Sequence, residues 1–349
     1  MKPRAISLFS GAGGFDLGFE KAGFDIVYAN ELNAASAATW KVNRRRNEGA
    51  MHQGDIAAKM DEVGLLRGVD VVFGGPPCQG FSIAGKMQED DPRNQLVHIF
   101  MTVVERVRPR VFVMENVKAL GVHQKWEKTR SALLEKAKQL GYDADYAVFQ
   151  VSDYGVSENR ERVLFVGVDS AKGSSSDFFE AIERYKRPSS SLRKVLEKVG
   201  AYGTDANPAS STAKVTVAKK PVLRGSAYSG MLVNGAGRPL NLEAVSPTLT
   251  ASMGGNSTPI VDQRALDDPN ETNWFVELHA ALSAGECGDL VVPNYIRRLT
   301  VKEAAAIQTF PAQYQFQGSK CSQYRQIGNA VPPRFSRAVA RAVYEAYFQ

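Results

Sequence analysis

One cysteine follows two prolines in the stretch GGPPCQGFS, residues 74–82. The prolines stiffen the backbone after the apolar run 69–73, and they place Cys78 ahead of a Gly- and Ser-rich loop that extends to Arg93. A lone cysteine is usually a small buried hydrophobe. A cysteine presented in this way can instead act as a nucleophile when nearby positive charge stabilises its thiolate. The pattern therefore favours nucleophilic chemistry at Cys78.

Two further motifs carry charge that such a nucleophile could use. In MENV, Glu115 follows the apolar run 110–114, which would put it close to Cys78, although an acid at this point can also be a helix cap. In ENRERV, Arg160 and Arg162 are two residues apart, so both point to one side of an extended chain. A salt-bridge ladder on the surface is the competing interpretation of the arginines.

A glycine-rich turn, FSGAGG at 9–14, follows the first apolar run and opens a helix. Such glycines allow a ligand close to the backbone and leave helix N–H groups free for an anionic group. Glu31 lies twenty residues after Gly11, where a carboxylate suits the hydroxyls of a ribose. The spacing is not the G-x-G-x-x-G of a dinucleotide site, so it favours S-adenosylmethionine over NAD; a plain tight turn is the alternative. Asp55 could accept a hydrogen bond from an adenine amino group, or be a turn residue.

Strand-like and helical segments alternate over residues 1–168, and these elements must position the candidate residues. Strand-like runs at 5–10, 25–29, 69–73, 110–114 and 162–168 alternate with helical patterns at 15–22, 96–107 and 128–140. This order predicts an α/β fold with a mostly parallel sheet that has helices on both faces. Ligands of such sheets bind outside the carboxyl ends of the strands, which is where the candidate residues fall.

The composition changes after residue 170. Residues 170–290 are rich in Ser, Gly, Asn and Pro, with short strand-like pieces at 214–218 and 230–233, which predicts a second, loop-rich domain. Between 184 and 238 there are eleven Lys or Arg against two acids, and between 262 and 289 one Arg against seven acids. The basic block favours contact with phosphates, with a solvated face as the alternative. A capping box at 300–303 and an amphipathic helix at 334–347 suggest a return to the first domain.

The composition excludes several classes of protein. The 349 residues are 44% hydrophobic and 23% charged, which rules out global disorder, and no apolar run approaches the roughly 20 residues of a membrane span. We expect no signal peptide at the N-terminus, because glycines soon interrupt its short apolar stretch. Three distant cysteines form neither a zinc pattern nor a disulfide framework, so we expect no metal and a reducing cytoplasm. The net charge of +6 permits a polyanionic partner.

Taken together, the blocks SLFSGAGGFDLGFEKAGF, GGPPCQGFS, MENV, ENRERV and YRQIGNAVPP resemble those of the DNA (cytosine-5) methyltransferases of bacterial restriction-modification systems, and they occur in the same order. The resemblance covers residues 4–168 and 296–349. It implies a Rossmann-like fold of the S-adenosylmethionine-dependent methyltransferases. It also implies a catalytic and cofactor-binding domain at 1–170, a target-recognition domain at 171–295 and a C-terminal part, 296–349, that returns to the catalytic domain.

The resemblance also implies an activity, that of a DNA (cytosine-5-)-methyltransferase (EC 2.1.1.37). Cys78 would attack C6 of a cytosine flipped out of a short duplex sequence, Glu115 would hold N3, and Arg162, supported by Arg160, would contact the O2 side. The cofactor would be S-adenosyl-L-methionine, with S-adenosyl-L-homocysteine as product. The matching cofactor positions are Phe9, Gly11, Gly13, Gly14, Glu31, Asp55, Ile56, Pro76, Leu96 and Asn329. Gln79, Ser82 and Arg93 match positions that contact DNA.

Four residues, at three sites, depart from the pattern of the family. Ser7 stands where many members have an acid, and Leu32 where some have a tryptophan. Ser157 and Glu158 replace a usual Pro-Gln pair, which places an additional acid near the arginines, where it could weaken or redirect them.

Two other functions compete with this one. A tRNA cytosine methyltransferase would share the fold, but it carries a Cys-Phe-Thr block that is absent here. A catalytically silent DNA-binding subunit is disfavoured by the intact set of Cys78, Glu115 and Arg162. We therefore expect double-stranded DNA as partner, with a cognate restriction endonuclease that catalysis does not require. We also expect a monomer without membrane contact, associated with DNA in a bacterial cytoplasm.

Overall fold

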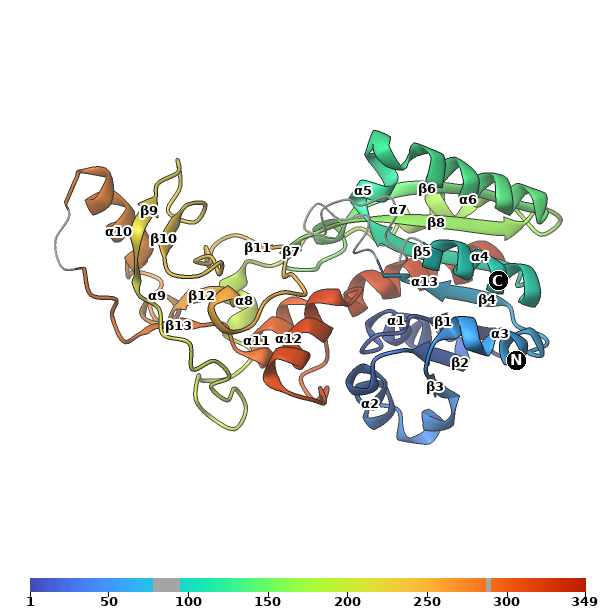
Figure 1. Ribbon diagram of the computed structural model, residues 1–349, viewed down its shortest axis with the longest axis horizontal. Helices are drawn as coiled ribbons and strands as arrows, with labels where there is room; N and C mark the ends of the chain where they lie inside the picture. Colours follow the sequence, from blue (N-terminus) through green and yellow to red (C-terminus); the bar gives the residue numbers. More distant parts are fainter. Residues whose placement is uncertain (78–94, 287–289) are drawn as a thin grey trace.

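The computed structural model describes residues 1–77, 95–286 and 290–349. Cys78, Gln79, Ser82 and Arg93 are therefore outside the described residues. The chain forms two lobes, and both termini lie in the lobe that contains the large sheet (Figure 1). Helices α11 and α12 lie between this lobe and the smaller one (Figure 1).

The large sheet has seven strands in the order β3-β2-β1-β4-β5-β8-β6. Their bounds are Arg4–Leu8 (β1), Asp25–Glu31 (β2), Met51–Gln53 (β3), Val71–Gly74 (β4), Val111–Val117 (β5), Tyr142–Gln150 (β6) and Glu161–Asp169 (β8). The strands from β3 to β5 are parallel, whereas β8 runs antiparallel to both β5 and β6. The α/β fold with a mostly parallel sheet is confirmed. Strand β6 was not predicted, because it is an edge strand in which polar residues interrupt the apolar pattern.

Helices cover both faces of this sheet (Figure 1). One apolar core lies between the sheet and the helices α1 (Gly14–Ala22), α2 (Ala34–Val42), α7 (Ser175–Glu183) and α13 (Pro333–Tyr347). A second core lies between the opposite face and the helices α3 (Met60–Gly64), α4 (Gln95–Val107), α5 (Lys118–Val122) and α6 (Glu127–Gln139). The predicted helices at 15–22, 96–107 and 128–140 therefore exist, each within one residue of its predicted bounds.

The last helix, α13, packs closely against α1. Proline 333 occupies its first turn, where the missing N–H costs no hydrogen bond. A Cβ at Gly18 of α1 would lie 2.0 Å from Ser336 Oγ, so only glycine allows this approach. Ser336 also donates a hydrogen bond to the carbonyl of Phe15. These contacts join the two ends of the chain, 320 residues apart, in one layer.

The smaller lobe contains short elements. Its strands are β9 (Val217–Val222), β10 (Met231–Val233), β12 (Ile260–Asp262) and β13 (Ile296–Arg298), and its helices are α9 (Gln263–Asp267) and α10 (Trp274–Ser283). The strand predicted at 214–218 instead begins at Val217. The side chain of Asn234 bonds the backbone of Lys214 and Thr216, which replaces regular strand pairing there.

Between the lobes, α8 (Leu192–Leu196), α11 (Val301–Ile307) and α12 (Lys320–Asn329) share a third apolar core. The predicted capping box is present at the start of α11, where Thr300 and Glu303 bond each other's backbone N–H. A two-residue strand, β11 (Ser246–Pro247), pairs with β7 (Glu158–Asn159) and so connects residues 246–250 to the start of β8. The remaining turns are 3₁₀ helices: η1 (Arg45–Ala50), η2 (Ile56–Lys59), η5 (Gln124–Trp126), η6 (Val151–Asp153) and η7 (Gly255–Ser257). Within the described ranges, no helix combines the length and apolarity that a membrane crossing needs.

Candidate active site

The glycine-rich turn lies at the carboxyl end of β1 and bends through left-handed backbone conformations. Phe9, Gly11 and Gly13 have φ angles of 54°, 55° and 81°. The Gly11 N–H donates to Glu31 Oε2 at 2.8 Å, and the Asn33 N–H donates to Glu31 Oε1 at 2.7 Å. Burial raises the pKa of Glu31, although these two N–H groups oppose that effect. The turn and the acid twenty residues later are thus in direct contact.

The turn is open on one side and closed on the other. A Cβ at Gly11 would meet no atom within 4 Å, whereas a Cβ at Gly14 would lie 2.4 Å from the carbonyl oxygen of Val331. Asn329 is the last residue of α12 and is exposed, and Val331 lies two residues after it. The structure therefore brings the C-terminal motif against the glycine turn, as a common ligand site would require.

The other predicted cofactor positions are at neighbouring strand ends. Asp55 is exposed and accepts a hydrogen bond from the Ala57 N–H at 2.9 Å, so it caps the turn η2, and Ile56 beside it is buried. Pro76 is buried after β4, and Leu96 is half-buried in the first turn of α4.

Glu115 and Arg162 form an ion pair across the antiparallel strands β5 and β8. Arg162 Nε lies 2.8 Å from Glu115 Oε1, and Glu115 is only 9% exposed. Burial raises the pKa of Glu115, and the charges of Arg162 and Arg160 lower it, with burial the larger effect. A buried carboxyl of this kind can keep a proton that it donates to a ring nitrogen.

The end of β4 leads directly toward this pair. A Cβ at Gly75 would lie 3.0 Å from Glu115 Oε2, and Asn116 Nδ2 donates to the Pro76 carbonyl at 3.1 Å. Glu115 therefore lies beside the backbone that precedes Cys78 in the sequence. Cys78 itself, the predicted nucleophile, lies outside the described residues, as do the predicted DNA contacts Gln79, Ser82 and Arg93.

Arg160 has surroundings different from those of Arg162. Its guanidinium donates to the carbonyls of Leu249 at 3.1 Å, Gly328 at 2.8 Å and Ala330 at 3.3 Å, and the residue is 2% exposed. Arg160 thus joins β8, the segment after β11 and the end of α12. It supports the architecture around the pair of Glu115 and Arg162 rather than presenting a free cation.

The additional acid, Glu158, is bound within the same junction. It is fully buried, and its Oε1 accepts from the Leu249 N–H at 2.6 Å and lies 3.4 Å from Arg160 Nη1. Its Oε2 has no hydrogen-bond partner among the described residues. Burial raises the pKa of Glu158, which opposes a permanent negative charge here. The carboxyl is paired with Arg160, and Arg162 remains paired with Glu115.

The other two departures have different surroundings. Ser7 is buried, and its Oγ lies 2.9 Å from Ser10 Oγ within the turn. The carboxyl of Asp16, from the first turn of α1, is close enough for the Ser7 hydroxyl to lower the pKa of Asp16. An acid is therefore present near the position where many family members carry one in the strand. Leu32 is 69% exposed at the end of β2.

The sequence did not indicate a buried polar network behind the glycine turn. Arg44, Trp40, Asp16 and Tyr314 are all at most 7% exposed and contact one another through hydrogen bonds or ring stacking. Arg44 begins a run of three arginines that resembles an ordinary solvated surface, and Tyr314 is 270 residues away. No spacing rule connects them, so only the folded structure could identify this network.

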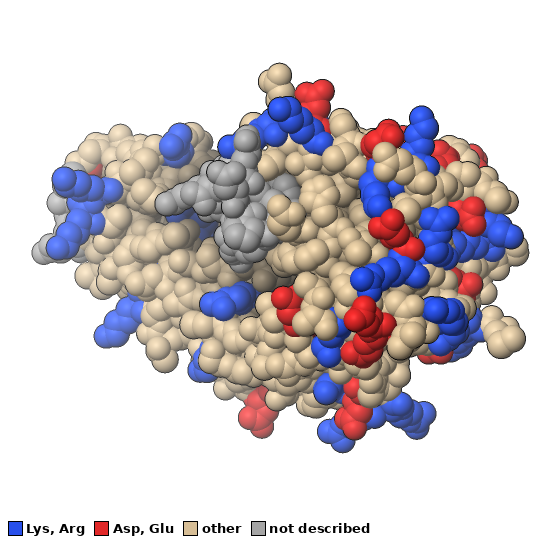
Figure 2. Space-filling model, turned by 45° about the vertical axis from the view of Figure 1, so that its right-hand side comes forward, with Lys and Arg blue, Asp and Glu red and all other residues tan. Residues whose placement is uncertain are grey.

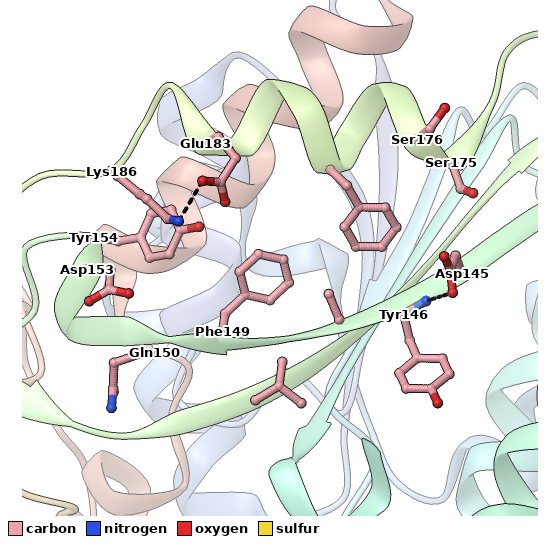
Figure 3. Close-up of a pocket in the computed structure, with 13 residues that line it drawn as sticks. Asp145, Tyr146, Phe149, Gln150, Asp153, Tyr154, Ser175, Ser176, Glu183 and Lys186 are labelled. Atoms are coloured by element: carbon pink, nitrogen blue, oxygen red, sulfur yellow. Dashed lines mark hydrogen bonds and ion pairs between the residues drawn. The ribbon is translucent and has the colours of Figure 1, made fainter. Parts of the chain in front are cut away.

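A pocket of about 450 Å³ lies beside the edge strand β6 and under α7 (Figure 3). Phe149 and Phe179 line its apolar part, and the ion pair between Lys186 and Glu183 lies at one end (Figure 3). None of the predicted catalytic, cofactor or DNA-contacting residues lines it. This pocket is therefore not the predicted active site.

The smaller lobe carries exposed basic side chains. In the face shown in Figure 2, a few Lys and Arg side chains are scattered over this lobe with few acids among them, whereas basic and acidic side chains are mixed on the larger lobe. Strand β9 itself presents Lys219 and Lys220, both exposed. Other members of the basic block are neutralised, since Arg193 pairs with Glu243 and Arg184 pairs with Glu345.

Comparison with known proteins gives the family. The sequence profile of the C-5 cytosine-specific DNA methylases matches residues 3–345. Type II methyltransferase M1.HphI of Haemophilus parahaemolyticus is 32% identical over 97% of this chain and 86% of its own length. Type II methyltransferase M.XorII of Xanthomonas oryzae pv. oryzae is 33% identical, over 99% and 85%. The structure of the S. pombe Dnmt2 methyltransferase, 15% identical, shares the fold with a TM-score of 0.63 over 99% of both chains. The chain belongs to the C-5 cytosine-specific DNA methylase family.

Proposed function

We propose that this protein transfers a methyl group from S-adenosyl-L-methionine to C5 of a flipped-out cytosine in a specific short sequence of duplex DNA. The observation that carries the proposal is the buried pair of Glu115 and Arg162, 2.8 Å apart, beside the backbone that leads to Cys78. A proton donor and a cation beside the chain that leads to a cysteine suit the addition of a thiolate to a pyrimidine.

Cys78, Glu115 and Arg162 have different roles in the proposed reaction. The thiolate of Cys78 adds to C6 of the cytosine, and the electron pair moves toward C5, which becomes nucleophilic. Glu115 donates a hydrogen bond or its proton to N3, which accommodates the charge that the addition develops. Arg162 holds the carboxyl of Glu115 in place and faces the O2 side of the base. After C5 has taken the methyl group, a base removes the C5 proton and the Cys78 thiolate is eliminated from C6, which restores the aromatic ring.

The glycine turn fits the proposed cofactor. When bound, S-adenosyl-L-methionine supplies an electrophilic methyl group and leaves as S-adenosyl-L-homocysteine. The turn is open at Gly11, and the first N–H groups of α1 are available for the carboxylate of the cofactor. Glu31 keeps lone pairs for the ribose hydroxyls, and Phe9 and Asp55 would contact the adenine. The full proposed set is Phe9, Gly11, Gly13, Gly14, Glu31, Asp55, Ile56, Pro76, Leu96 and Asn329.

The DNA would lie between the lobes. We assign residues 1–170 and 296–349 to catalysis and cofactor binding, and residues 171–295 to target recognition. The exposed lysines of β9 suit phosphate contacts, whereas base readout would come from segments that the charge pattern does not identify. Gln79, Ser82 and Arg93 would contact DNA near the flipped base. The chemistry needs one chain, so we expect a monomer, and a companion restriction endonuclease would act separately.

Base-resolution sequencing of methylated cytosine tests the proposal directly. The gene is expressed in a bacterial host that lacks DNA methylation, in parallel with Cys78→Ala and with Cys321→Ala. Cys321 is an exposed cysteine in the first turn of α12 and belongs to none of the predicted catalytic motifs, so its variant controls for loss of a thiol as such. We expect methylation in one short recurring motif for the unchanged chain and for Cys321→Ala, and none for Cys78→Ala.

Two results would overturn the proposal. Methylation by Cys78→Ala would remove the covalent mechanism. Methylated RNA in place of methylated DNA, with soluble protein, would replace the substrate.

A further inference from the structure

Arg44 binds the glycine turn from the side of α2. Its Nη2 donates to the Gly13 carbonyl at 3.0 Å, and its Nε and Nη2 bind the two carboxylate oxygens of Glu20 at 2.7 and 3.0 Å. The guanidinium also stacks on Trp40, with its central carbon 4.7 Å from the ring centre. Both Nε and Nη2 are thus bound and the guanidinium plane rests on an aromatic ring, which fixes the position of this buried cation.

Arg44 also explains why residue 13 is glycine. A Cβ there would lie 2.5 Å from Arg44 Nη1 and 2.9 Å from Trp40 Cδ1. The positive φ of Gly13 adds a backbone reason for the same residue. A glycine at position 13 therefore leaves the space that the side chain of Arg44 occupies.

Tyr314 binds the adjacent carbonyl of the same turn. Its hydroxyl donates to Ala12 O at 2.5 Å and accepts from Arg44 Nη1 at 3.1 Å. The ring is 4% exposed and packs against Phe310 and Phe316. One tyrosine therefore links the guanidinium to the turn.

The segment that carries Tyr314 is itself anchored on α2. Asn43, which follows α2, exchanges two hydrogen bonds with the backbone of Gln315, and the Gln317 N–H donates to Thr39 Oγ1 at 2.8 Å. Thr39 Oγ1 in turn donates to Gln326 of α12. These contacts fix the position of the Tyr314 hydroxyl relative to the glycine turn.

We propose that Arg44 and Tyr314 are positioning residues for cofactor binding: by fixing the Ala12 and Gly13 carbonyls they hold the Gly13 N–H on the Ser10 carbonyl at 2.8 Å and aim the Gly14 N–H at the carboxylate of the cofactor. In a trans peptide the C=O and the following N–H point in opposite directions, so a fixed carbonyl fixes the donor beyond it. The Gly14 N–H, which follows the Gly13 carbonyl, is in the first turn of α1 and has no partner within the helix. The proposal rests on the proposed function, because it assumes the same cofactor.

Tyr314→Phe is the sharpest test, because it removes one oxygen and keeps the ring. The matched control is Tyr324→Phe: Tyr324 is 2% exposed, and its hydroxyl donates to the Leu299 carbonyl at 2.5 Å, away from the turn. Binding of S-adenosyl-L-homocysteine is measured by calorimetry, with the melting temperature of each variant recorded in parallel. We expect about tenfold weaker binding for Tyr314→Phe, because the hydroxyl that links Arg44 to the Ala12 carbonyl is lost, and less than about twofold change for Tyr324→Phe.

Steady-state kinetics add a readout that general destabilisation would not produce. For Tyr314→Phe, the KM for S-adenosyl-L-methionine should rise by more than kcat falls, with the KM for DNA unchanged. Arg44→Lys should weaken cofactor binding further, because a lysine cannot bind Glu20, Gly13 and Tyr314 together.

The outcomes separate the two proposals. Wild-type affinity in folded Tyr314→Phe, or an equal loss in Tyr324→Phe, would refute the positioning role and leave the proposed function intact. A wild-type chain that binds no S-adenosyl-L-homocysteine would refute the proposed cofactor, and the positioning role with it.

Discussion

Asn116 donates a hydrogen bond from Nδ2 to the carbonyl oxygen of Pro76, 3.1 Å away, between the ends of the adjacent strands β5 and β4. Asn116 follows Glu115 directly, and Pro76 precedes Cys78 by two residues. The residue next to the proposed acid thus fixes the backbone next to the proposed nucleophile. Beyond the last paired residues of the two strands, Gly74 and Met114, this nearly fully buried amide joins the two chain segments.

Replacement of this amide should affect chemistry more than stability. In Asn116→Ala the Pro76 carbonyl loses its partner, the strand exit gains freedom, and kcat should fall by about tenfold or more. Asn207→Ala is a matched control, since Asn207 is equally buried but bonds Gly200 and Glu303 in another part of the molecule. Single-turnover methylation rates at saturating cofactor and DNA measure the effect. An equal loss of rate in both variants would show that the effect is not local.

The pH dependence of methylation should depend on Glu115. Burial raises the pKa of this carboxyl, so its protonated form, which can donate to N3, is lost as pH rises through that raised value. The rate of the wild type should therefore have a descending limb toward high pH, opposite to the rising limb of a cysteine that ionises. Glu115→Gln has no such proton and should be slower by about 10²-fold to 10⁴-fold, without that limb.

Glu158→Gln is the control for that profile. Glu158 is a second buried acid near the same arginines, and its pKa is also raised, but its carboxyl binds Leu249 and Arg160. The descending limb should persist in this variant. If the limb disappears in Glu158→Gln and remains in Glu115→Gln, the two acids have the opposite roles.

Much of this site was predictable from the sequence, because its residues follow apolar runs that end in turn residues. The contact between Gly11 and Glu31 and the closeness of Glu115 to the Pro-Pro exit both follow from the rule that parallel strands share one carboxyl edge. Prediction failed where position depends on long-range contacts. Edge strand β6 lacks a continuous apolar pattern, and the start of β9 is displaced by the side chain of Asn234.

The partners that distinguish the two arginines could not be predicted from the residues. The alternation in ENRERV predicts that Arg160 and Arg162 share a side, and the charges of both lower the pKa of Glu115. Arg160, however, donates to the backbone carbonyls of residues 249, 328 and 330, whereas Arg162 pairs with Glu115 of β5. A local sequence pattern predicts the direction of a side chain, but it does not predict which distant backbone groups contact that side chain.

The junction around Glu158 should be a sensitive point for stability. Glu158→Ala leaves the Leu249 N–H unpaired and removes the acid next to the buried cation of Arg160, so the free energy of unfolding should fall by about 3–5 kcal/mol. Glu158→Gln keeps an acceptor for Leu249 and should lose less than about 2 kcal/mol. Urea unfolding at pH 7 distinguishes them. Equal losses in the two variants would mean that the charge of Glu158, and not its hydrogen bond, stabilises the junction.

The pH dependence of stability should depend on Asp16. Burial raises the pKa of Asp16 from 3.8 to about 6, against the opposing effects of Arg44 and of the hydrogen bond from Trp40. The folded state therefore binds a proton where the unfolded state has already lost it. Stability from this group is complete below the unfolded pKa and declines as pH rises through about 6, by roughly 3 kcal/mol in all.

Asp16→Asn should abolish this decline, because the amide oxygen still accepts from Trp40 and nothing titrates. The free energy of unfolding, measured in urea from about pH 4 to about pH 8, should then fall less steeply with pH than in the wild type. Asp143→Asn is a control of opposite sign, since Ser174 and Ser175 lower the pKa of Asp143 and its stabilisation is lost as pH falls. An unchanged slope in Asp16→Asn would mean that other groups set the pH dependence and that the carboxyl of Asp16 stays ionised within the fold.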